Sequence, residues 1–327
     1  MSSVLNPVVA TRFDELWPDE SVRLRRLTRY AEINASSEDP LVIHLTHRGF
    51  LSEVHVLNGV MLYALMHHKR LAVSTARFNG HHWKDYFASE LPPADEQLIA
   101  SIPSQDQLIK IGLPRFQQHK AWIGQALSKN TQFSLEALGI NGDLLQAQRT
   151  LLRLFCRPTS EIETQAGAEM SRLGLAAGRF AAVQIRRGDK IAVQIKQGQP
   201  WIEGEVAAPE AVARLLEQYS PDTREVFLVT DDFAAVGELQ AALPRRRVTS
   251  LCPEDQIGHD QTMFNAGGAE ARNEGVRRLL VECLIAAVSD AFVGGYKSNI
   301  STFVANIHHD CRRCVSLDSR QTPLLWQ

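Results

Sequence analysis

Short apolar runs alternate with longer segments of helical periodicity along much of the chain. Near the N-terminus, Leu41–Leu45 is a short, largely apolar run and predicts a strand. Glu53–His68 carries apolar residues at helical spacing and predicts a helix. Leu71–Ser74 predicts the next strand, so these three segments predict a βαβ unit.

The same alternation is clearer in the second half of the chain. Short apolar segments predict strands at Ala181–Ile185, Val226–Thr230, Arg247–Leu251, Ala291–Val293 and Cys314–Leu317. Segments with helical spacing predict helices at Pro209–Tyr219, Phe233–Leu243, Asn273–Val288 and Ser298–His308. Strands that alternate with helices form a parallel sheet with right-handed crossovers. A further helix is predicted over Arg157–Gly178, leading from the first half into the second.

The pattern as a whole predicts an α/β protein of two Rossmann-like domains that face each other across a cleft. We place the domains at residues 1–165 and 166–327, because a chain of 327 residues fits two domains of ordinary size. Ligands of such sheets bind beyond the carboxyl ends of the strands, so functional residues are expected there.

Composition narrows the class of protein. Hydrophobic residues make up 44% and charged residues 22%, which excludes a disordered chain and a coiled-coil rod. The 35 basic and 37 acidic residues give a net charge of -2, hence no chain-wide positive field for nucleic acid or an anionic membrane. We expect no membrane span and no secretory signal, and the five cysteines then favour a cytoplasmic protein with reduced thiols.

The segment Val183–Lys190, VQIRRGDK, begins as a strand and turns at its glycine. Arg186 and Arg187 then lie at the carboxyl edge of the sheet, where planar guanidinium groups can bind a diphosphate. Lys190 adds a cation, and Asp189 can hold one arginine or cap the turn. Basic clusters also occur on solvated strand ends, so this segment alone leaves both interpretations open.

Two further segments carry candidate chemistry at the same edge. In VFLVTDD, Asp232 is typical of a helix N-cap, whereas Asp231 is the better candidate for a ligand or supporting role. In LLVECLIAAVSD, Glu282 is surrounded by apolar residues. A buried carboxylate needs a partner, and guanine offers two adjacent N–H donors. The alternative is a surface glutamate beside Arg277 or Arg278.

The segment GGYKSNIST follows the last of these helices. Ser298 predicts the N-cap of the next helix, and the N–H groups at a helix N-terminus attract anions. Its neighbours Lys297 and Asn299 belong to the same predicted binding segment.

In order and spacing, VQIRRGDK, VFLVTDD and VECLIAAVSDAFVGGYKSNISTFVA resemble the three motifs of the α1,6-/α1,2- and protein O-fucosyltransferase superfamily. Within the superfamily, these motifs most resemble those of the α1,6-fucosyltransferases that modify N-glycan cores and chitin-oligosaccharide nodulation signals. The N-terminal HRGFLSEVHVLNGVMLYALMHHKRLAV also resembles that family's glycine-rich loop and first helix, so the likeness covers about residues 41–75 and 180–318. It implies a GT-B-like fold and inverting transfer of fucose from GDP-fucose to a glycan or glycoconjugate, without a metal or cofactor.

The resemblance also implies roles for individual residues. Arg186 matches an essential arginine that contacts the β-phosphate of the donor, and Gln184 and Arg187 belong to the same predicted donor-binding set. Lys190 matches a lysine near the active centre. Glu282 stands where an aspartate pairs with guanine, and Ser298 matches a serine close to the diphosphate.

Several positions depart from the family pattern. Gln184 stands in place of a histidine, and Gln194 in place of a carboxylate assigned to the base machinery. Inverting transfer needs a group that takes the acceptor's proton. Glu203 and Glu205 in the WIEGE segment are the candidates, with Asp189 and the leaving diphosphate as alternatives.

The N-terminal loop supplies the candidates for acceptor binding, which are His47, Gly49 and Glu53. Leu51 replaces a glycine and Glu53 a glutamine of the family pattern. Near the C-terminus, HHDCRRC contains a C-x-x-C step, but it lacks the second cysteine pair of a typical zinc site, so we predict no metal.

Two alternatives stay open. The same fold can use another nucleotide sugar, because a phosphate-binding site does not identify the sugar. The chain can also be a non-catalytic protein that binds a nucleotide sugar or a glycan, as Gln184 and Gln194 suggest. In each case we expect a nucleotide-sugar or glycan partner and no nucleic acid.

Overall fold

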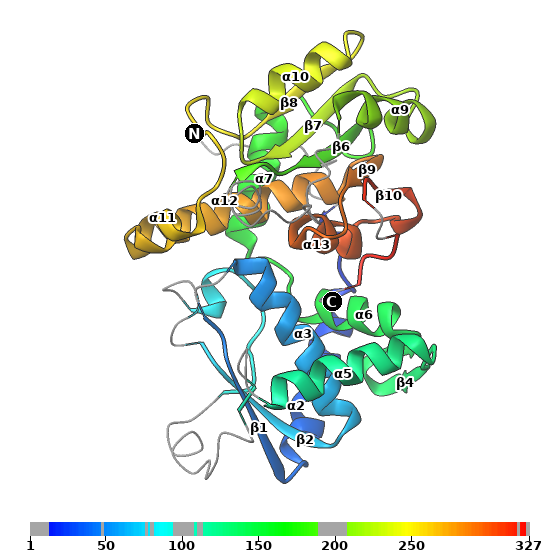
Figure 1. Ribbon diagram of the computed structural model, residues 1–327. Coiled ribbons are helices and arrows are strands. Elements are labelled where there is room, and N and C mark those ends of the chain that lie inside the picture. Colours follow the sequence, from blue (N-terminus) through cyan, green and yellow to red (C-terminus); the bar gives the residue numbers. More distant parts are fainter. Residues whose placement is uncertain are drawn as a thin grey trace. The chain divides into compact units, whose positions relative to one another are not determined.

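The computed structural model describes residues 13–46, 49–75, 78, 82–93, 108–109, 114–188, 208–318 and 321–324. The chain divides into two units, drawn in Figure 1. Unit 1 comprises Met1–Leu16 and Ser160–Pro323, and unit 2 comprises Trp17–Thr159 and Leu324–Gln327. Each unit is described by itself below.

Unit 1 contains a five-stranded parallel sheet in the order β10-β9-β6-β7-β8. Its strands are β6 (Phe180–Ile185), β7 (Glu225–Thr230), β8 (Arg247–Ser250), β9 (Ala291–Gly294) and β10 (Cys314–Ser316). Its helices are α7 (Ser160–Leu173), α9 (Pro209–Tyr219), α10 (Ala234–Ala242), α11 (Gln261–Ala266), α12 (Ala269–Ala287) and α13 (Asn299–Ile307). Because β6 lies in the middle and later strands add on both sides, the order is that of a Rossmann fold.

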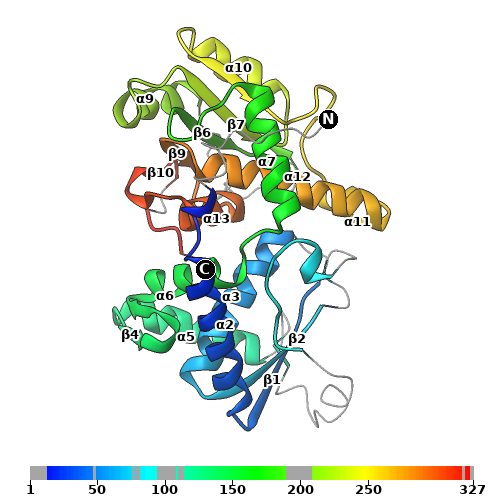
Figure 2. The same cartoon turned by 180° about the vertical axis from the view of Figure 1, so that it is seen from behind.

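Helices cover both faces of this sheet. Ala181, Val183 and Ile185 of β6 pack in one core with apolar residues of α9 and α10. Gln184, between them in sequence, bonds instead to Ser301 of α13, which places α13 on the opposite face. Helices α7 and α12 pack against each other, and α12 also packs on β6 and β7; Figure 2 shows them from behind. The result is a three-layer αβα unit.

Unit 2 contains a smaller parallel sheet in the order β2-β1-β3 and an antiparallel pair, β4-β5. Its strands are β1 (Asp39–His44), β2 (Lys69–Ser74), β3 (Leu108–Ile109), β4 (Phe133–Leu135) and β5 (Ile140–Gly142), and its helices are α2 (Glu20–Ala35), α3 (Phe50–Met66), α5 (Pro114–Ser128) and α6 (Leu144–Phe155). Helix α3 connects β1 to β2 and packs against both strands and against α5 and α6. Nearly all of its residues are therefore buried.

The helices and strands agree closely with the sequence pattern. The predicted βαβ unit is present as β1, α3 and β2, and the five strands predicted in the second half form the parallel sheet of unit 1. The helix predicted over Arg157–Gly178 is wrong in extent, because α7 spans only Ser160–Leu173. Gly174 adopts a left-handed conformation with φ 68°, which ends the helix.

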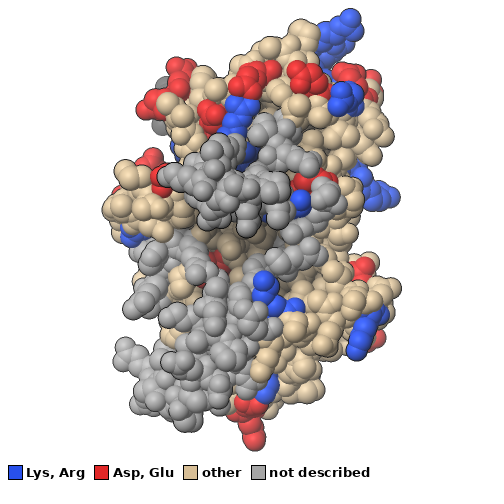
Figure 3. Space-filling model, viewed as in Figure 1, with Lys and Arg blue, Asp and Glu red and all other residues tan. Residues whose placement is uncertain are grey.

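The surface carries both signs of charge. On the face shown in Figure 3, Lys and Arg side chains lie among Asp and Glu side chains over the described residues. In the described part of the chain, no helix has the length and apolar character that a membrane crossing requires.

Candidate functional site

The strand order of unit 1 defines where a ligand would bind. The chain leaves β6 through α9 toward β7, and leaves β9 through α13 toward β10, so the connections diverge between the neighbours β6 and β9. Ligands of open α/β sheets bind outside the carboxyl ends of the strands at such a point. Arg186 directly follows β6, and Gly295 directly follows β9. Two of the predicted segments thus end at the same edge of one sheet.

The loop after β6 is held by Asp231, which follows β7. Its Oδ1 accepts a hydrogen bond from the backbone N–H of Arg187 at 2.7 Å, and its Oδ2 accepts one from that of Gly188 at 3.0 Å. The same Oδ2 lies 3.8 Å from Nε of Arg186. Asp231 therefore supports the loop and sets a negative charge beside the Arg186 guanidinium.

The Arg187 side chain has carboxylate partners in unit 1. It bonds to both carboxylate oxygens of Glu238 in α10 and lies 3.5 Å from Asp232. These contacts raise the pKa of Arg187, the Glu238 hydrogen bond first among the causes. Asp232 also accepts a hydrogen bond of 3.1 Å from the N–H of Ala234, the first residue of α10. The N-cap of α10 is Phe233, however, so the prediction that Asp232 is the N-cap is wrong by one residue. The structure thus places Arg187 against α10.

A second loop packs closely on the arginine segment. A Cβ atom added to Gly188 would lie 2.2 Å from the backbone nitrogen of His259 and 2.8 Å from Asp231 Oδ2. Gly258 lies equally close to Gly188: a Cβ atom added to Gly258 would lie 2.8 Å from Cα of Gly188. Gly258 also has a φ of 71°, which favours glycine. A side chain at position 188 would therefore displace the loop that carries Arg186.

The N-terminus of α13 is the second element of the site. Ser298 is its N-cap and is only 6% exposed. Its hydroxyl has no hydrogen-bond partner among the described residues. N–H groups in the first turn of a helix have no partner within the helix, and a buried hydroxyl without a partner is costly. Both features fit an anion bound at this helix end.

Gln184 connects the two elements. It is buried in β6, and its Oε1 accepts a hydrogen bond of 2.8 Å from the hydroxyl of Ser301, in the first turn of α13. An uncharged amide in this contact holds α13 against β6. In the structure, Gln184 therefore links strand β6 to helix α13. Its predicted contact with the donor stays a prediction.

Glu282 is a buried carboxylate in α12, with 6% of its surface exposed. Burial raises the pKa of Glu282 to about 8, while Arg278 lowers it and Asp231 raises it further. No described residue forms a hydrogen bond with its carboxylate, since Arg277 pairs with Glu161 and Arg278 with Gln256. Glu282 is therefore not the surface glutamate of the alternative interpretation.

The other residues predicted at this edge divide between described and undescribed parts of the chain. Lys297 donates its backbone N–H to Asp318 at 2.8 Å, and Asn299 is the first residue of α13. Lys190, Glu203 and Glu205 lie outside the described residues. Their roles stay predictions.

Unit 2 has a corresponding point in its own sheet. Its order β2-β1-β3 reverses between β1 and β3, and the loop after β1 leads to Gly49, the N-cap of α3. Glu53 is buried and accepts hydrogen bonds from the N–H of Thr46 at 2.8 Å and from its hydroxyl at 3.1 Å. Glu53 therefore supports the loop from within, and His47 lies outside the described residues.

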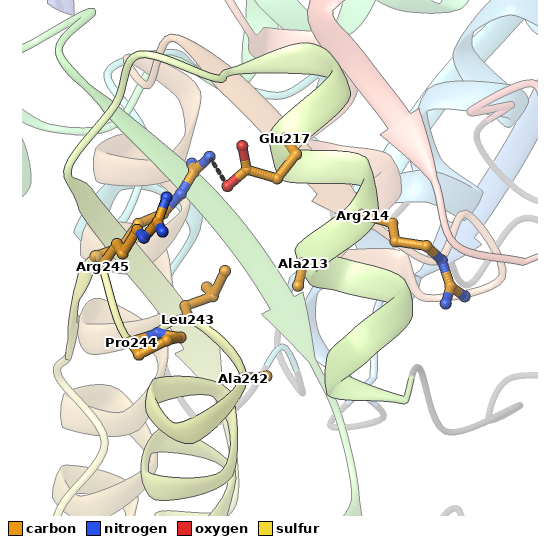
Figure 4. A pocket seen from close by; sticks show the side chains of 8 residues that line it. Ala213, Arg214, Glu217, Ala242, Leu243, Pro244 and Arg245 are labelled. Atoms are coloured by element: carbon orange, nitrogen blue, oxygen red, sulfur yellow. Dashed lines mark hydrogen bonds and ion pairs between the residues drawn. The ribbon is translucent and has the colours of Figure 1, made fainter.

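Other features of unit 1 lie away from this edge. A hollow between α9 and α10 is lined by Ala213, Arg214, Glu217, Ala242, Leu243, Pro244, Arg245 and Arg246 (Figure 4). It lies just before the start of β8, at the opposite end of the sheet from Arg186. No group of three or more His, Cys, Asp or Glu side chains in the described ranges could hold a metal ion.

Three residues that support the loops of this site were not predicted from the sequence. Asp318 follows the last strand, Glu238 lies on the exposed side of α10, and Gly258 belongs to a loop that the pattern left unassigned. For Asp318, its place directly after the predicted strand Cys314–Leu317 is a signal that would have found it. For the other two, no sequence signal exists, because their partners come from loop packing.

Comparison with known proteins gives likenesses of structure. No protein-family model and no curated protein matches the chain. Similar solved structures include a mutant of Arabidopsis thaliana FUT1 in complex with GDP, at 12% identity over 94% of this chain and 77% of that chain, with a TM-score of 0.47. They also include POFUT1 in complex with GDP-fucose (13% identity, 84% and 96% covered, TM-score 0.48) and with GDP (14%, 84% and 97%, TM-score 0.49).

Proposed function

We propose that the chain is an inverting glycosyltransferase that transfers L-fucose from GDP-fucose to a hydroxyl of a glycan or glycoconjugate. The observation that carries the proposal is the topology of unit 1: Arg186 and the α13 N-terminus follow the carboxyl ends of the neighbouring strands β6 and β9, between which the strand order reverses. A guanidinium and the N–H groups of a helix end are both phosphate-binding groups.

In this proposal the donor's diphosphate lies between these two elements. Arg186 contacts the β-phosphate, and Ser298 donates its buried hydroxyl to a phosphate oxygen. Lys297 and Asn299 complete the binding segment at the helix end. The guanine base reaches Glu282, whose two carboxylate oxygens accept its adjacent N–H donors. The lack of a described hydrogen-bond partner for both Ser298 and Glu282 supports their assignment to a ligand.

The reaction is a single displacement at the anomeric carbon of fucose. The acceptor oxygen forms a bond to C1 from the face opposite the diphosphate, and the bond from C1 to the β-phosphate oxygen breaks. The electron pair leaves with GDP, whose growing negative charge Arg186 stabilises. The acceptor's proton passes to a base, for which Glu203, Glu205 and Asp189 are the candidates and the leaving diphosphate is the alternative.

We further propose that unit 1 binds the donor and unit 2 the acceptor, the division of roles in the GT-B-like arrangement that the sequence predicts. The loop containing His47 and Gly49 would then contact the acceptor, with Glu53 holding it through Thr46. The positive groups at the diphosphate make a metal ion unnecessary in this proposal, and no other cofactor enters the reaction. A cytoplasmic location belongs to the same proposal.

The test is release of GDP from GDP-fucose in the presence of a panel of glycan acceptors. The wild-type protein should release GDP with at least one acceptor, or slowly by hydrolysis without one. Arg186→Ala should abolish release. Arg172→Ala, which removes an exposed arginine of unit 1 paired with Glu169, is the matched control and should leave release unchanged.

A non-catalytic donor-binding protein is the second candidate. The observation that favours it is Gln184, whose amide holds α13 and cannot accept a proton at the position where the related family has a histidine. A protein that binds GDP-fucose but releases no GDP with any acceptor, and none by hydrolysis, would be of this kind. The same assay therefore separates the two functions.

A further inference from the structure

Asp318 lies just beyond β10, at the carboxyl edge of the unit 1 sheet, and contacts the turn that leads into α13. Its Oδ2 accepts a hydrogen bond from the backbone N–H of Lys297 at 2.8 Å. Its Oδ1 accepts one from the hydroxyl of Ser316 at 3.1 Å. The carboxylate is therefore fixed by donors on both oxygens, one from its own strand and one from the neighbouring turn.

The chain makes room for this contact at Gly295. A Cβ atom placed on Gly295 would lie 2.8 Å from Oδ2 of Asp318, so any side chain here would displace that carboxylate. The turn itself closes through the N–H of Ser298, which donates to the carbonyl oxygen of Gly295 at 2.9 Å. Asp318, Gly295 and the turn thus form one closely packed unit directly before α13.

This arrangement parallels the support of the other phosphate-binding element. Asp231, just beyond β7, accepts from backbone N–H groups of the loop after β6. Asp318, just beyond β10, accepts from a backbone N–H of the loop after β9. In both cases a carboxylate from the adjacent strand's end fixes the loop that reaches the predicted diphosphate.

We propose that Asp318 is a positioning residue for the donor: it orients the N-terminus of α13, with the Ser298 hydroxyl, toward the diphosphate. The inference rests on the proposed function. Asp318 itself does not touch the donor, since a carboxylate facing a diphosphate would repel it. It acts through Lys297 and Ser298, so its loss should weaken contacts to the diphosphate and leave those to the base unchanged.

The experiment compares the affinities of GDP and guanosine, measured by calorimetry, across matched variants. Asp318→Ala should weaken GDP by about tenfold or more and change guanosine by less than about twofold, because only GDP carries the phosphates that α13 binds. Asp318→Asn should recover most of the GDP affinity, since an amide oxygen still accepts from Lys297. Asp310→Ala is the control: Asp310 holds another turn of unit 1 by accepting from the N–H of Arg312 at 3.1 Å.

Gly295→Ala perturbs the contact between Asp318 and the turn before α13 without changing Asp318 itself. The added methyl group should displace the Asp318 carboxylate and weaken GDP, but it should have little further effect in the Asp318→Ala background. This pair of variants keeps the test decisive if Asp318→Ala fails to fold.

The outcomes separate this inference from the proposed function. Equal losses of GDP and guanosine in Asp318→Ala, or wild-type GDP affinity in that variant and in Gly295→Ala, would overturn the positioning role alone. A wild-type protein that binds neither GDP nor guanosine would overturn the proposed function instead.

Discussion

Replacing Glu282 by glutamine should make the protein more stable near neutral pH and a weaker binder of guanine. Burial raises the pKa of Glu282 from its ordinary value of 4.5 to about 8. At 1.36 kcal/mol per pH unit, this difference amounts to about 5 kcal/mol. The buried, ionised carboxylate therefore costs the folded protein a large part of its stability above pH 8.

The sign of the pH dependence follows from where the proton is bound. Below pH 4.5 the carboxyl group is protonated in both the folded and the unfolded state. Between pH 4.5 and about 8 the folded state keeps the proton and the unfolded state releases it, so stability falls as pH rises. Glu282→Gln cannot ionise. It should remove this slope and should be more stable than the wild type by roughly 3 kcal/mol at pH 7.

Binding should show the opposite trend, because guanine needs the ionised carboxylate. With the pKa of Glu282 at about 8, the ionised fraction rises from about 1% at pH 6 to half at pH 8. The affinity of the wild type should therefore rise about 50-fold over this range. Guanosine is the better ligand for this assay, because it carries no phosphate that titrates.

Calorimetry from pH 6 to pH 8 with guanosine, alongside denaturant unfolding at each pH, measures both effects. Glu282→Gln should bind guanosine weakly and with little pH dependence. An unchanged affinity of the wild type across the range, or an equal rise in Glu282→Gln, would refute the assignment of Glu282 to the base.

Three other predictions concern the two adjacent arginines and the need for a metal ion. Arg186→Lys keeps a positive charge but loses the bidentate geometry of the guanidinium group. It should therefore lower turnover of GDP-fucose by about 100-fold or more, nearly as much as Arg186→Ala. Wild-type turnover in a folded Arg186→Ala variant would disprove the mechanism. Binding of GDP and transfer should both survive excess EDTA, and a strict need for manganese or magnesium would contradict this. Arg187→Ala should lower the melting temperature. Because Arg187 and Glu238 pair in the folded state, the double variant with Glu238→Ala should lose less stability than the sum of the two single variants. Fully additive effects would argue against that pair.

Much of unit 1 could be predicted from the sequence because its central strands, β6, β7 and β9, are buried on both faces. Val226–Thr230 and Ala181–Ile185 are short, largely apolar runs, which are typical of the central strands of a parallel sheet, and both are in the sheet. The position of Arg186 at a carboxyl edge follows from that assignment. The burial of Glu282 could also be predicted, since apolar residues surround it in the helix.

What the sequence could not show are contacts between residues far apart in the chain. Two partners of Arg187 among the described residues are Glu238 and Asp232, which are far from it in sequence and reach it because α10 packs beside the loop. The bond from Ser301 to Gln184 likewise depends on α13 crossing the face of β6. The exact end of α7 also depends on one local conformation, that of Gly174.

The central claim is that unit 1 binds a guanosine diphosphate sugar, and the most direct measurement is a thermal-shift panel of GDP, UDP, dTDP and GDP-fucose on the wild-type protein. GDP and GDP-fucose should raise the melting temperature, because a ligand at 100 times its dissociation constant adds about 2.7 kcal/mol to the stability of the folded state. UDP and dTDP, which lack the pair of N–H donors that Glu282 accepts, should leave it nearly unchanged. Equal shifts with GDP and UDP, or none with any nucleotide, would contradict the account.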